Sequence, residues 1–332
     1  MNVGINKTLK RRLITFVSGL AIGGLALLVL LLLSFSFLIS SDLPRSTLID
    51  KYRGPTSFIY RLPSGADAHI RDEGRKDGPV MFLIHGSNAS LHTWEPWVAE
   101  LGDRYRLISF DLPGHGLTGA TPEDDYSLDA MVRFTKEIAD VFKLDKVILA
   151  GNSMGGAVAL KFAIDHPRQT EALVLVSAAG LPRDAQDSSV GAFRLTDKAW
   201  GRALMRYVTP KFAAGSTLRG VVADPDNFVT VEMVTRYWEL LRMTGSRDAT
   251  IKRFTSPRQP FADRLGEIRV PTLILWGQQD PLVKVKYGVR MNSAITGSLL
   301  KLYPQAGHLA HEEIPAITAR DTQQFLDDTL LD

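Results

Sequence analysis

Residues 146–156 read Lys-Val-Ile-Leu-Ala-Gly-Asn-Ser-Met-Gly-Gly, and helix-forming residues follow from Ala157 to Ile164. An apolar run, a Gly-x-Ser-x-Gly turn and a helix form the context in which this motif marks a nucleophilic serine. Gly151 and Gly155 flank Ser153 on a turn that leaves no room for side chains at those two positions. The motif therefore predicts that Ser153 lies at the N-terminus of a helix, where the helix dipole favours developing negative charge. Ordinary strand-to-helix turns also match five residues of this kind, so further motifs must support the interpretation.

The composition is that of a globular protein with one basic end. Of the 332 residues, 45% are hydrophobic and 23% are charged, which is enough for a sizeable core. The net charge is +3, but four positive charges precede the first acid, Asp42, and the remainder carries −1. A nearly neutral body has no basic face for nucleic acid. The absence of cysteine excludes disulfides, thiolate catalysis and Cys-ligated zinc, and we expect neither metal nor cofactor.

One segment near the N-terminus is long and apolar. Residues 13–41 contain no charged side chain, and residues 25–33 are almost entirely aliphatic. About 27 helical residues at about 1.5 Å each reach about 40 Å, which exceeds the roughly 30 Å hydrocarbon core of a bilayer. A cleaved signal peptide has a shorter apolar region, and a buried soluble helix is rarely so uniformly apolar. We therefore predict that residues 13–40 are an uncleaved signal anchor that contacts the lipid bilayer.

The flanking charges predict the orientation of this anchor. Basic residues favour the cytoplasmic side of a membrane, and more of them precede the segment than follow it closely. Residues 1–12 are accordingly expected in the cytoplasm, and the catalytic body outside it, in the periplasm or another extracytoplasmic space. The upstream residues are Lys7, Lys10, Arg11 and Arg12; the downstream ones, which oppose this bias without reversing it, are Arg45, Lys51 and Arg53.

Strands and helices alternate through residues 57–180 and 268–332. Continuous apolar runs such as 80–84 are typical of strands buried on both faces of a parallel sheet. The alternation predicts a mostly parallel sheet with right-handed crossovers and helices on both faces. Besides the strand of the opening motif, the predicted strands are 58–61, 68–71, 80–84, 105–110, 172–176, 270–276 and 298–302; the predicted helices are 94–101, 128–142, 283–295 and 315–326.

The alternation stops between residues 181 and 267. This stretch is rich in arginine and aromatic residues, and we expect it to form a helical cap over the edge of the sheet. Residues 41–56 are polar and contain proline, and we expect them to tether the anchor to the body. The cap aromatics are Phe193, Trp200, Tyr207, Phe212, Phe228, Tyr237, Trp238 and Phe254.

With these segments placed, residues 57–330 resemble the α/β-hydrolase superfamily. The resemblance rests on five motifs in the family's order, which is nucleophile, acid and then histidine. They are His85-Gly86, Asp111-x-Pro-Gly-His-Gly, Gly-Asn-Ser153-Met-Gly-Gly, Trp276-Gly-Gln-Gln-Asp280 and Gly307-His308, with Glu313 and Pro315 downstream.

The resemblance implies a catalytic triad. Ser153 would be the nucleophile, His308 the base that removes its proton, and Asp280 the acid that orients the imidazole. A cap for the following helix is the alternative role for Asp280. His311 is a rival to His308, but it lacks the preceding glycine and is expected to face solvent or a helix.

The resemblance also implies the residues that surround the triad. The backbone N–H groups of Ser87 and Met154 would form the oxyanion hole. His85, Asp111 and His115 are expected to brace the site and to take no part in the chemistry.

The motifs do not decide which bond is cleaved: ester, thioester, lactone, amide and some C–C bonds all stay open. A serine nucleophile argues against the haloalkane dehalogenase and epoxide hydrolase branches, which place aspartate there. The anchor and the aromatic cap look like the membrane-anchored monoacylglycerol lipases, so we expect a hydrolase of apolar carboxylic esters, including lipid esters. The elbow is also similar to that of meta-cleavage-product (C–C) hydrolases, although Ser87-Asn88-Ala89-Ser90 and Leu309 depart from their pattern. A catalytically silent, membrane-tethered binding protein is a third hypothesis, and oligomeric state stays open.

Overall fold

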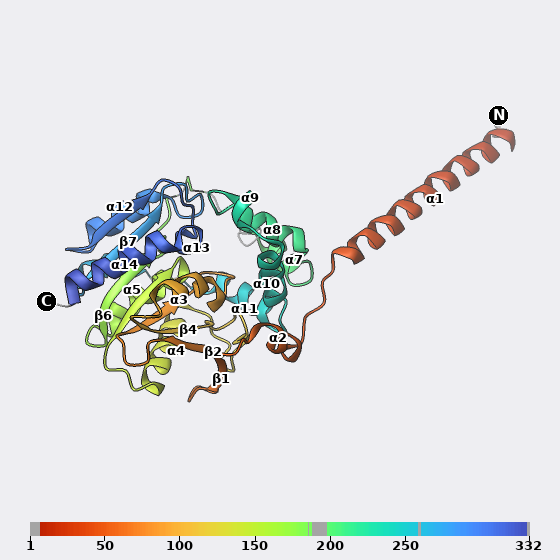
Figure 1. Cartoon of the computed structure of the whole chain (residues 1–332). Coiled ribbons are helices and arrows are strands. Elements are labelled where there is room, and N and C mark those ends of the chain that lie inside the picture. Colours follow the sequence, from red (N-terminus) through yellow and green to blue (C-terminus); the bar gives the residue numbers. More distant parts are fainter. Residues whose placement is uncertain (1–6, 185, 188–197, 258–259, 331–332) are drawn as a thin grey trace.

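The computed structural model describes residues 7–184, 186–187, 198–257 and 260–330, and Figure 1 shows their arrangement. The strands form an eight-stranded sheet in the order β1-β2-β4-β3-β5-β6-β7-β8. Strand β2 runs antiparallel to β1 and β4, and every other neighbouring pair is parallel, which confirms the expected mostly parallel sheet. The strands are β1 (Ser57–Arg61), β2 (Asp67–Gly74), β3 (Val80–Ile84), β4 (Arg106–Phe110), β5 (Val147–Asn152), β6 (Thr170–Val176), β7 (Thr272–Gly277) and β8 (Leu299–Tyr303).

Helices cover both faces of this sheet. Successive side chains of a strand point to opposite faces, so a continuous apolar run supplies two cores at once. In β3, Phe82 and Ile84 pack into one core, whereas Met81 and Leu83 pack into the other, and all four are fully buried. The first core is closed by α4 (Leu128–Val141), α5 (Met154–Asp165) and α12 (Val285–Ala294); the second is closed by the 3₁₀ helix η1 (Leu91–Trp94), α3 (Glu95–Leu101), α13 (Ala310–Glu313) and α14 (Pro315–Leu330).

The described part of residues 181–267 is helical and lies between the sheet and the N-terminal helix (Figure 1). Helix α10 carries a Thr230 cap whose side chain accepts from the N–H of Met233, as expected for a threonine at this position. Phe193 lies outside the described residues. The helices are α7 (Ala199–Met205), α8 (Lys211–Arg219), α9 (Pro225–Phe228), α10 (Val231–Leu241), α11 (Ser246–Thr255) and the 3₁₀ helix η2 (Ala262–Glu267).

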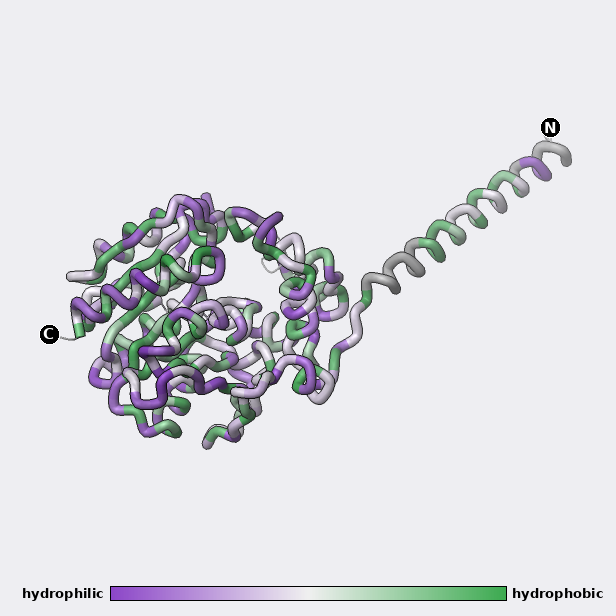
Figure 2. Tube along the Cα trace, viewed as in Figure 1, coloured by the Kyte–Doolittle hydropathy of each residue, from purple (hydrophilic) through white to green (hydrophobic). Residues whose placement is uncertain are grey.

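Helix α1 (Lys7–Leu38) projects from the body. Its segment Lys10–Leu30 has a mean hydropathy of 2.4 and is long and apolar enough to cross a membrane, judged by length and composition. Figure 2 shows this apolar character along the helix. The residues expected to form a tether instead include α2 (Arg45–Tyr52), whose Leu48 is buried against Leu117 and Leu240. The chain thus joins the folded body directly after α1.

Candidate active site

Ser153 occupies the sharp turn between β5 and α5. Its backbone has φ 53° and ψ −116°, a left-handed conformation that is rare for a residue with a side chain. A Cβ atom on Gly155 would lie 2.1 Å from the carbonyl oxygen of Ile84, and one on Gly151 would lie 2.4 Å from that of Gly155. Both glycines of the motif are therefore required by close backbone approach, and the turn places Ser153 at the start of α5.

Asp280 and His308 form a buried pair on the loops after β7 and β8. Asp280 Oδ2 lies 2.7 Å from His308 Nδ1, while Oδ1 accepts from the N–H groups of Leu282 at 2.8 Å and Val283 at 2.9 Å. The two backbone donors hold the carboxylate in place. An ionised carboxylate oxygen can only accept a hydrogen bond, so the contact of Oδ2 with His308 requires the imidazole proton to be on Nδ1. Nε2 is then left with a lone pair, which is the state a general base needs.

Ser153 and His308 line the same cavity, whose volume is about 320 Å³. Asn152 joins their two loops, because its Nδ2 donates to the carbonyl oxygens of His308 at 3.1 Å and Val176 at 3.2 Å. The hydrogen bonds among the described residues do not include one between Ser153 Oγ and His308 Nε2. In enzymes without substrate that bond is often long and tightens only in the complex. The three side chains expected from the sequence are thus brought to one site.

Two unengaged backbone N–H groups lie beside Ser153. Neither the Ser87 N–H, after β3, nor the Met154 N–H, at the start of α5, donates a hydrogen bond within the part of the chain that the structure describes. Arg253 of α11 bridges these loops, since Nη2 donates to Asn88 Oδ1 at 3.1 Å and Nη1 lies 3.6 Å from Met154 Sδ. No sequence motif surrounds Arg253, and the sequence therefore did not single it out.

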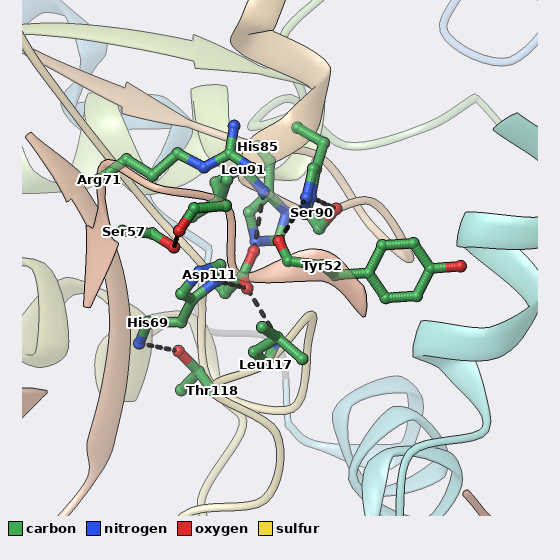
Figure 3. Close-up of polar contacts among 12 residues, drawn as sticks. Tyr52, Ser57, His69, Arg71, His85, Ser90, Leu91, Asp111, Leu117 and Thr118 are labelled. Carbon is green, nitrogen blue, oxygen red and sulfur yellow. Dashed lines mark hydrogen bonds and ion pairs between the residues drawn. The ribbon is translucent and has the colours of Figure 1, made fainter. Parts of the chain in front are cut away.

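A second buried Asp–His pair braces the loops beneath the site (Figure 3). Asp111 Oδ2 lies 2.6 Å from His69 Nδ1, and the carboxylate also accepts from the N–H groups of Leu91 and Leu117, each at 2.7 Å. Burial alone would raise the pKa of Asp111, but the adjacent His69 brings the pKa well below its usual range. This arrangement resembles the Asp280–His308 pair, yet none of its members lines the cavity. Its contacts join β2, η1 and the loop after β4, which is the bracing arrangement expected for Asp111.

The other buried histidines have structural contacts. His85 Nε2 accepts from the Leu112 N–H at 2.9 Å, and Nδ1 donates to the Gly86 carbonyl at 2.7 Å. Burial lowers the pKa of His85, so the ring stays neutral in this fixed tautomer. His311 does not reach solvent: it is fully buried, stacks on Trp94 with ring centroids 4.3 Å apart, and its pKa is lowered by burial to about 3. Of the two expected surroundings, solvent is wrong and a helix is right, because the ring of His311 packs against Trp94 and against Trp97 of α3.

The cap forms the walls of the cavity, and they are largely apolar. The polar lining residues on α10 and α11 are Tyr237, Arg247 and Thr250, and the sequence had singled out none of them for a role in the site. Burial raises the pKa of Tyr237, so its hydroxyl remains protonated at neutral pH. The guanidinium of Arg247 is engaged by Asp42, with Nε and Nη2 at 3.0 and 2.5 Å from Oδ1. The apolar walls include Leu204, Val208, Phe212, Leu218, Val221 and Leu282.

Glu313 fastens the loop that carries His308. Its carboxylate accepts from the N–H groups of Gly307 at 3.0 Å, Leu309 at 3.1 Å and Ala223 at 2.8 Å. The His308 N–H itself donates to the carbonyl oxygen of Val221 at 2.8 Å. Because Val221 and Ala223 follow α8, the position of the histidine loop depends on the cap as well as on the sheet.

Comparison with known proteins agrees with this architecture. Residues 79–315 match the family described as the alpha/beta hydrolase fold. A 2-hydroxy-6-oxo-2,4-heptadienoate hydrolase of Pseudomonas putida is 30% identical over 261 residues, covering 74% of this chain and 88% of that protein. A 2-hydroxy-6-oxononadienedioate/2-hydroxy-6-oxononatrienedioate hydrolase of Comamonas testosteroni is 27% identical over 78% of this chain and 90% of its own length. The crystal structure of a membrane phospholipase A, a bacterial virulence factor, has a TM-score of 0.72 at 23% identity and covers 97% of this chain and 99% of that one.

Proposed function

The chain belongs to the alpha/beta hydrolase family, and on that premise we propose that it is a membrane-anchored serine hydrolase of carboxylic esters with apolar acyl groups. The observation that carries the proposal is the Asp280–His308 pair, which opens onto the same cavity as Ser153. A base with its proton on Nδ1, held beside a serine in a strained turn, is the arrangement that acyl transfer requires.

In the proposed reaction Ser153 Oγ attacks the ester carbonyl while His308 Nε2 accepts its proton. The Ser87 and Met154 N–H groups, at the N-terminal end of α5, would stabilise the negative charge that develops on the carbonyl oxygen. His308 then protonates the leaving alcohol, and an acyl-enzyme on Ser153 remains. A water molecule, deprotonated by His308, hydrolyses that ester and restores the serine. Asp280 stabilises the imidazolium at both stages.

The cavity supports an apolar, uncharged substrate. Its volume of about 320 Å³ suits a small organic molecule, and its cap walls are lined by aliphatic and aromatic side chains. Arg247 is the cation of the lining among the described residues, and its charge is balanced by Asp42. The lining residues that the structure describes therefore offer a substrate carboxylate no positive charge that is not already paired with an acid.

Cleavage of a C–C bond is the second candidate, because relatives of this chain are named as hydrolases of 2-hydroxy-6-oxo dienoates. Such compounds carry a carboxylate, which the balanced Arg247 does not favour. The two functions are distinguished by measuring hydrolysis of a series of p-nitrophenyl esters of increasing acyl length beside hydrolysis of a 2-hydroxy-6-oxo dienoate. Preference for the dienoate would replace ester hydrolysis as the function.

A fluorophosphonate probe tests the nucleophile directly. We expect the wild-type protein to be labelled and the Ser153→Ala variant to be unlabelled and inactive towards every ester. Equal labelling of both proteins would remove Ser153 from the mechanism and the serine hydrolase proposal with it. Absence of labelling in a folded wild-type protein would instead support a catalytically silent binding protein.

The anchoring and orientation of the chain are part of the same proposal. We infer that residues 13–40 span the bilayer with residues 1–12 in the cytoplasm and the catalytic body exported, because four basic residues precede the apolar segment. A periplasm-dependent reporter fused after Ser41 should be active. Activity of a cytoplasm-dependent reporter at the same position would reverse the orientation.

A further inference from the structure

The end of α1 is joined to the cap without a spacer. Ile39, the residue after α1, pairs with Val208 in an antiparallel bridge. The Ser40 N–H donates to the carbonyl oxygen of Tyr207 at 2.9 Å, and Ser40 Oγ donates to that of Thr209 at 3.1 Å. The connection from α7 to α8 is therefore fastened to the point where α1 ends, on the side of the body from which α1 projects in Figure 1.

The length of α1 places this junction at the level of lipid headgroups. The first uncharged residue after Arg12 is Leu13, and α1 ends at Leu38. These 26 residues rise by about 39 Å at about 1.5 Å each, whereas the hydrocarbon core is about 30 Å thick and the whole bilayer about 40–45 Å. Upright, with Leu13 at the inner edge of the hydrocarbon, α1 would end about 9 Å beyond the outer edge, whereas the headgroup layer on each side is about 5–8 Å thick. At the usual tilt of about 20° the helix spans about 37 Å, and the bridge between Ile39 and Val208 then lies at the outer side of the headgroup layer. The cap segment that is joined to Ile39 and Ser40 is therefore held next to the membrane surface.

The same part of the cap exposes large aromatic side chains. Trp200 is 65% exposed, Tyr207 58% and Phe212 71%. Trp200 and Tyr207 are seven residues apart, two helical turns, and so share one side of α7 and its C-terminal extension. Tryptophan and tyrosine favour the membrane–water interface, where their rings are partly in hydrocarbon and their polar groups partly in water. Exposed aromatics beside a membrane anchor indicate a lipid-facing surface.

The charge of this segment is complementary to anionic lipid. Residues 198–220 contain five basic residues and no acidic one. Arg206 pairs with Asp248 and Arg219 with Asp226, both acids from other cap segments. Lys198 and Lys211 form no salt bridge among the described residues, so the segment keeps an excess of positive charge. Each basic residue near an anionic leaflet contributes about 1 kcal/mol of attraction. The basic residues are Lys198, Arg202, Arg206, Lys211 and Arg219.

The inner side of these two helices faces the catalytic cavity. Leu204, Val208 and Leu218 line it. Phe212 lines it as well, although most of its surface is exposed to solvent. The cavity thus reaches the molecular surface at the start of α8, next to the exposed aromatics. One pair of helices combines a surface suited to lipid with a passage towards Ser153.

We propose that the outer side of α7 and α8 docks onto the anionic bilayer from which α1 emerges, so that acyl chains enter the cavity from the membrane past Phe212. The docking rests on the proposed anchoring by α1, and the entry route rests on the proposed ester hydrolysis. The docking surface is a second membrane contact, separate from the spanning helix.

The chain contains no cysteine, so single cysteines can report on the surface directly. Tyr207→Cys and Phe212→Cys would be labelled with an environment-sensitive fluorophore in the full chain, reconstituted in vesicles of phosphatidylcholine with or without phosphatidylglycerol. Val289→Cys on α12 is the matched control, since Val289 is also an exposed apolar residue, at 48%, on a helix far from α1. Quenchers attached to lipid headgroups and to shallow acyl carbons measure the contact.

We expect strong quenching and a blue shift at both cap positions, greater with phosphatidylglycerol, and weak quenching at position 289. Quenching at both cap positions no stronger than at position 289 overturns the docking. A blue shift that persists in lipid-free detergent, with cross-linking between cysteines at position 207, would assign the surface to a second copy of the chain and also overturn it.

A kinetic comparison separates this proposal from the proposed function. The double variant Trp200→Ser, Tyr207→Ser changes two exposed residues outside the cavity lining. It should hydrolyse esters embedded in vesicles several-fold more slowly than the wild type, with unchanged hydrolysis of a soluble short-chain ester. Equal rates on embedded esters would refute entry from the membrane while leaving ester hydrolysis intact. A wild-type protein that hydrolyses neither ester would refute the proposed function and the entry route, whereas quenching would still decide the docking.

Discussion

Replacing Asp280 by asparagine tests the catalytic pair with little change in shape. An asparagine oxygen can still accept from the N–H groups of Leu282 and Val283. Its amide group would then face His308 Nδ1, where the carboxylate oxygen now lies at 2.7 Å. Because an amide NH₂ only donates, Nδ1 must become the acceptor and the proton must move to Nε2. Nε2 would then carry the proton and could not accept the proton of Ser153, because the remaining lone pair would lie on Nδ1.

The corresponding change in serine proteases lowers kcat about 10⁴-fold, which is about 5.5 kcal/mol of transition-state stabilisation. We expect a loss of that order for Asp280→Asn in the initial rate of p-nitrophenyl ester hydrolysis, with the thermal midpoint shifted by only a few degrees.

Asp111→Asn is the matched control, because Asp111 also accepts from one histidine and two backbone N–H groups. Since this pair lies outside the cavity lining, its loss should cost stability on the order of 3 kcal/mol and leave the kcat of the folded fraction within a few-fold of wild type. Near-normal activity of Asp280→Asn, or a greater loss of kcat in folded Asp111→Asn, would refute the assignment of Asp280.

Three further changes test other contacts. Gly155→Ala should destabilise the protein by about 3 kcal/mol or more in urea unfolding, since its Cβ would lie 2.1 Å from the Ile84 oxygen; Gly266→Ala, with its nearest atom 3.9 Å away, should be neutral. Glu313→Gln replaces an acceptor of three N–H groups and should lower kcat at least tenfold by releasing the His308 loop; wild-type kcat would exclude that positioning role. Burial raises the pKa of Glu312 to about 8, above its unfolded value, so the contribution of Glu312 to stability is greatest below about pH 4.5 and falls towards pH 8 by at most about 1.4 kcal/mol per unit. Between those pH values the stability of Glu312→Gln should depend less steeply on pH than that of the wild type, and an unchanged slope would show that Glu312 is not its source.

The amino-acid sequence by itself determined the sheet, its polarity and the candidate catalytic residues. Continuous apolar runs such as 80–84, alternating along the chain with helical segments, are typical of a parallel sheet that helices cover on both faces, and the structure has that sheet. The turn at Ser153 could also be predicted from the sequence, because the φ of 53° at Ser153 and the close backbone approach at Gly155 both require the Gly-x-Ser-x-Gly spacing. Such features depend on neighbours within a few residues, and local sequence records them.

Only the tertiary structure decided the contacts between distant segments. The burial of His311 against Trp94, the bridging of Asn88 and Met154 by Arg253, and the packing of α2 join residues far apart in the chain. So does the bridge between Ile39 and Val208, which fastens the cap to the end of α1. These contacts depend on which surfaces pack against each other when the chain folds. The pattern of residue types along one strand or helix does not contain that information. The contacts of the cap and of residues 41–56 are therefore decided by folding, whereas local spacing along the chain predicts the sheet and the proposed nucleophile, Ser153.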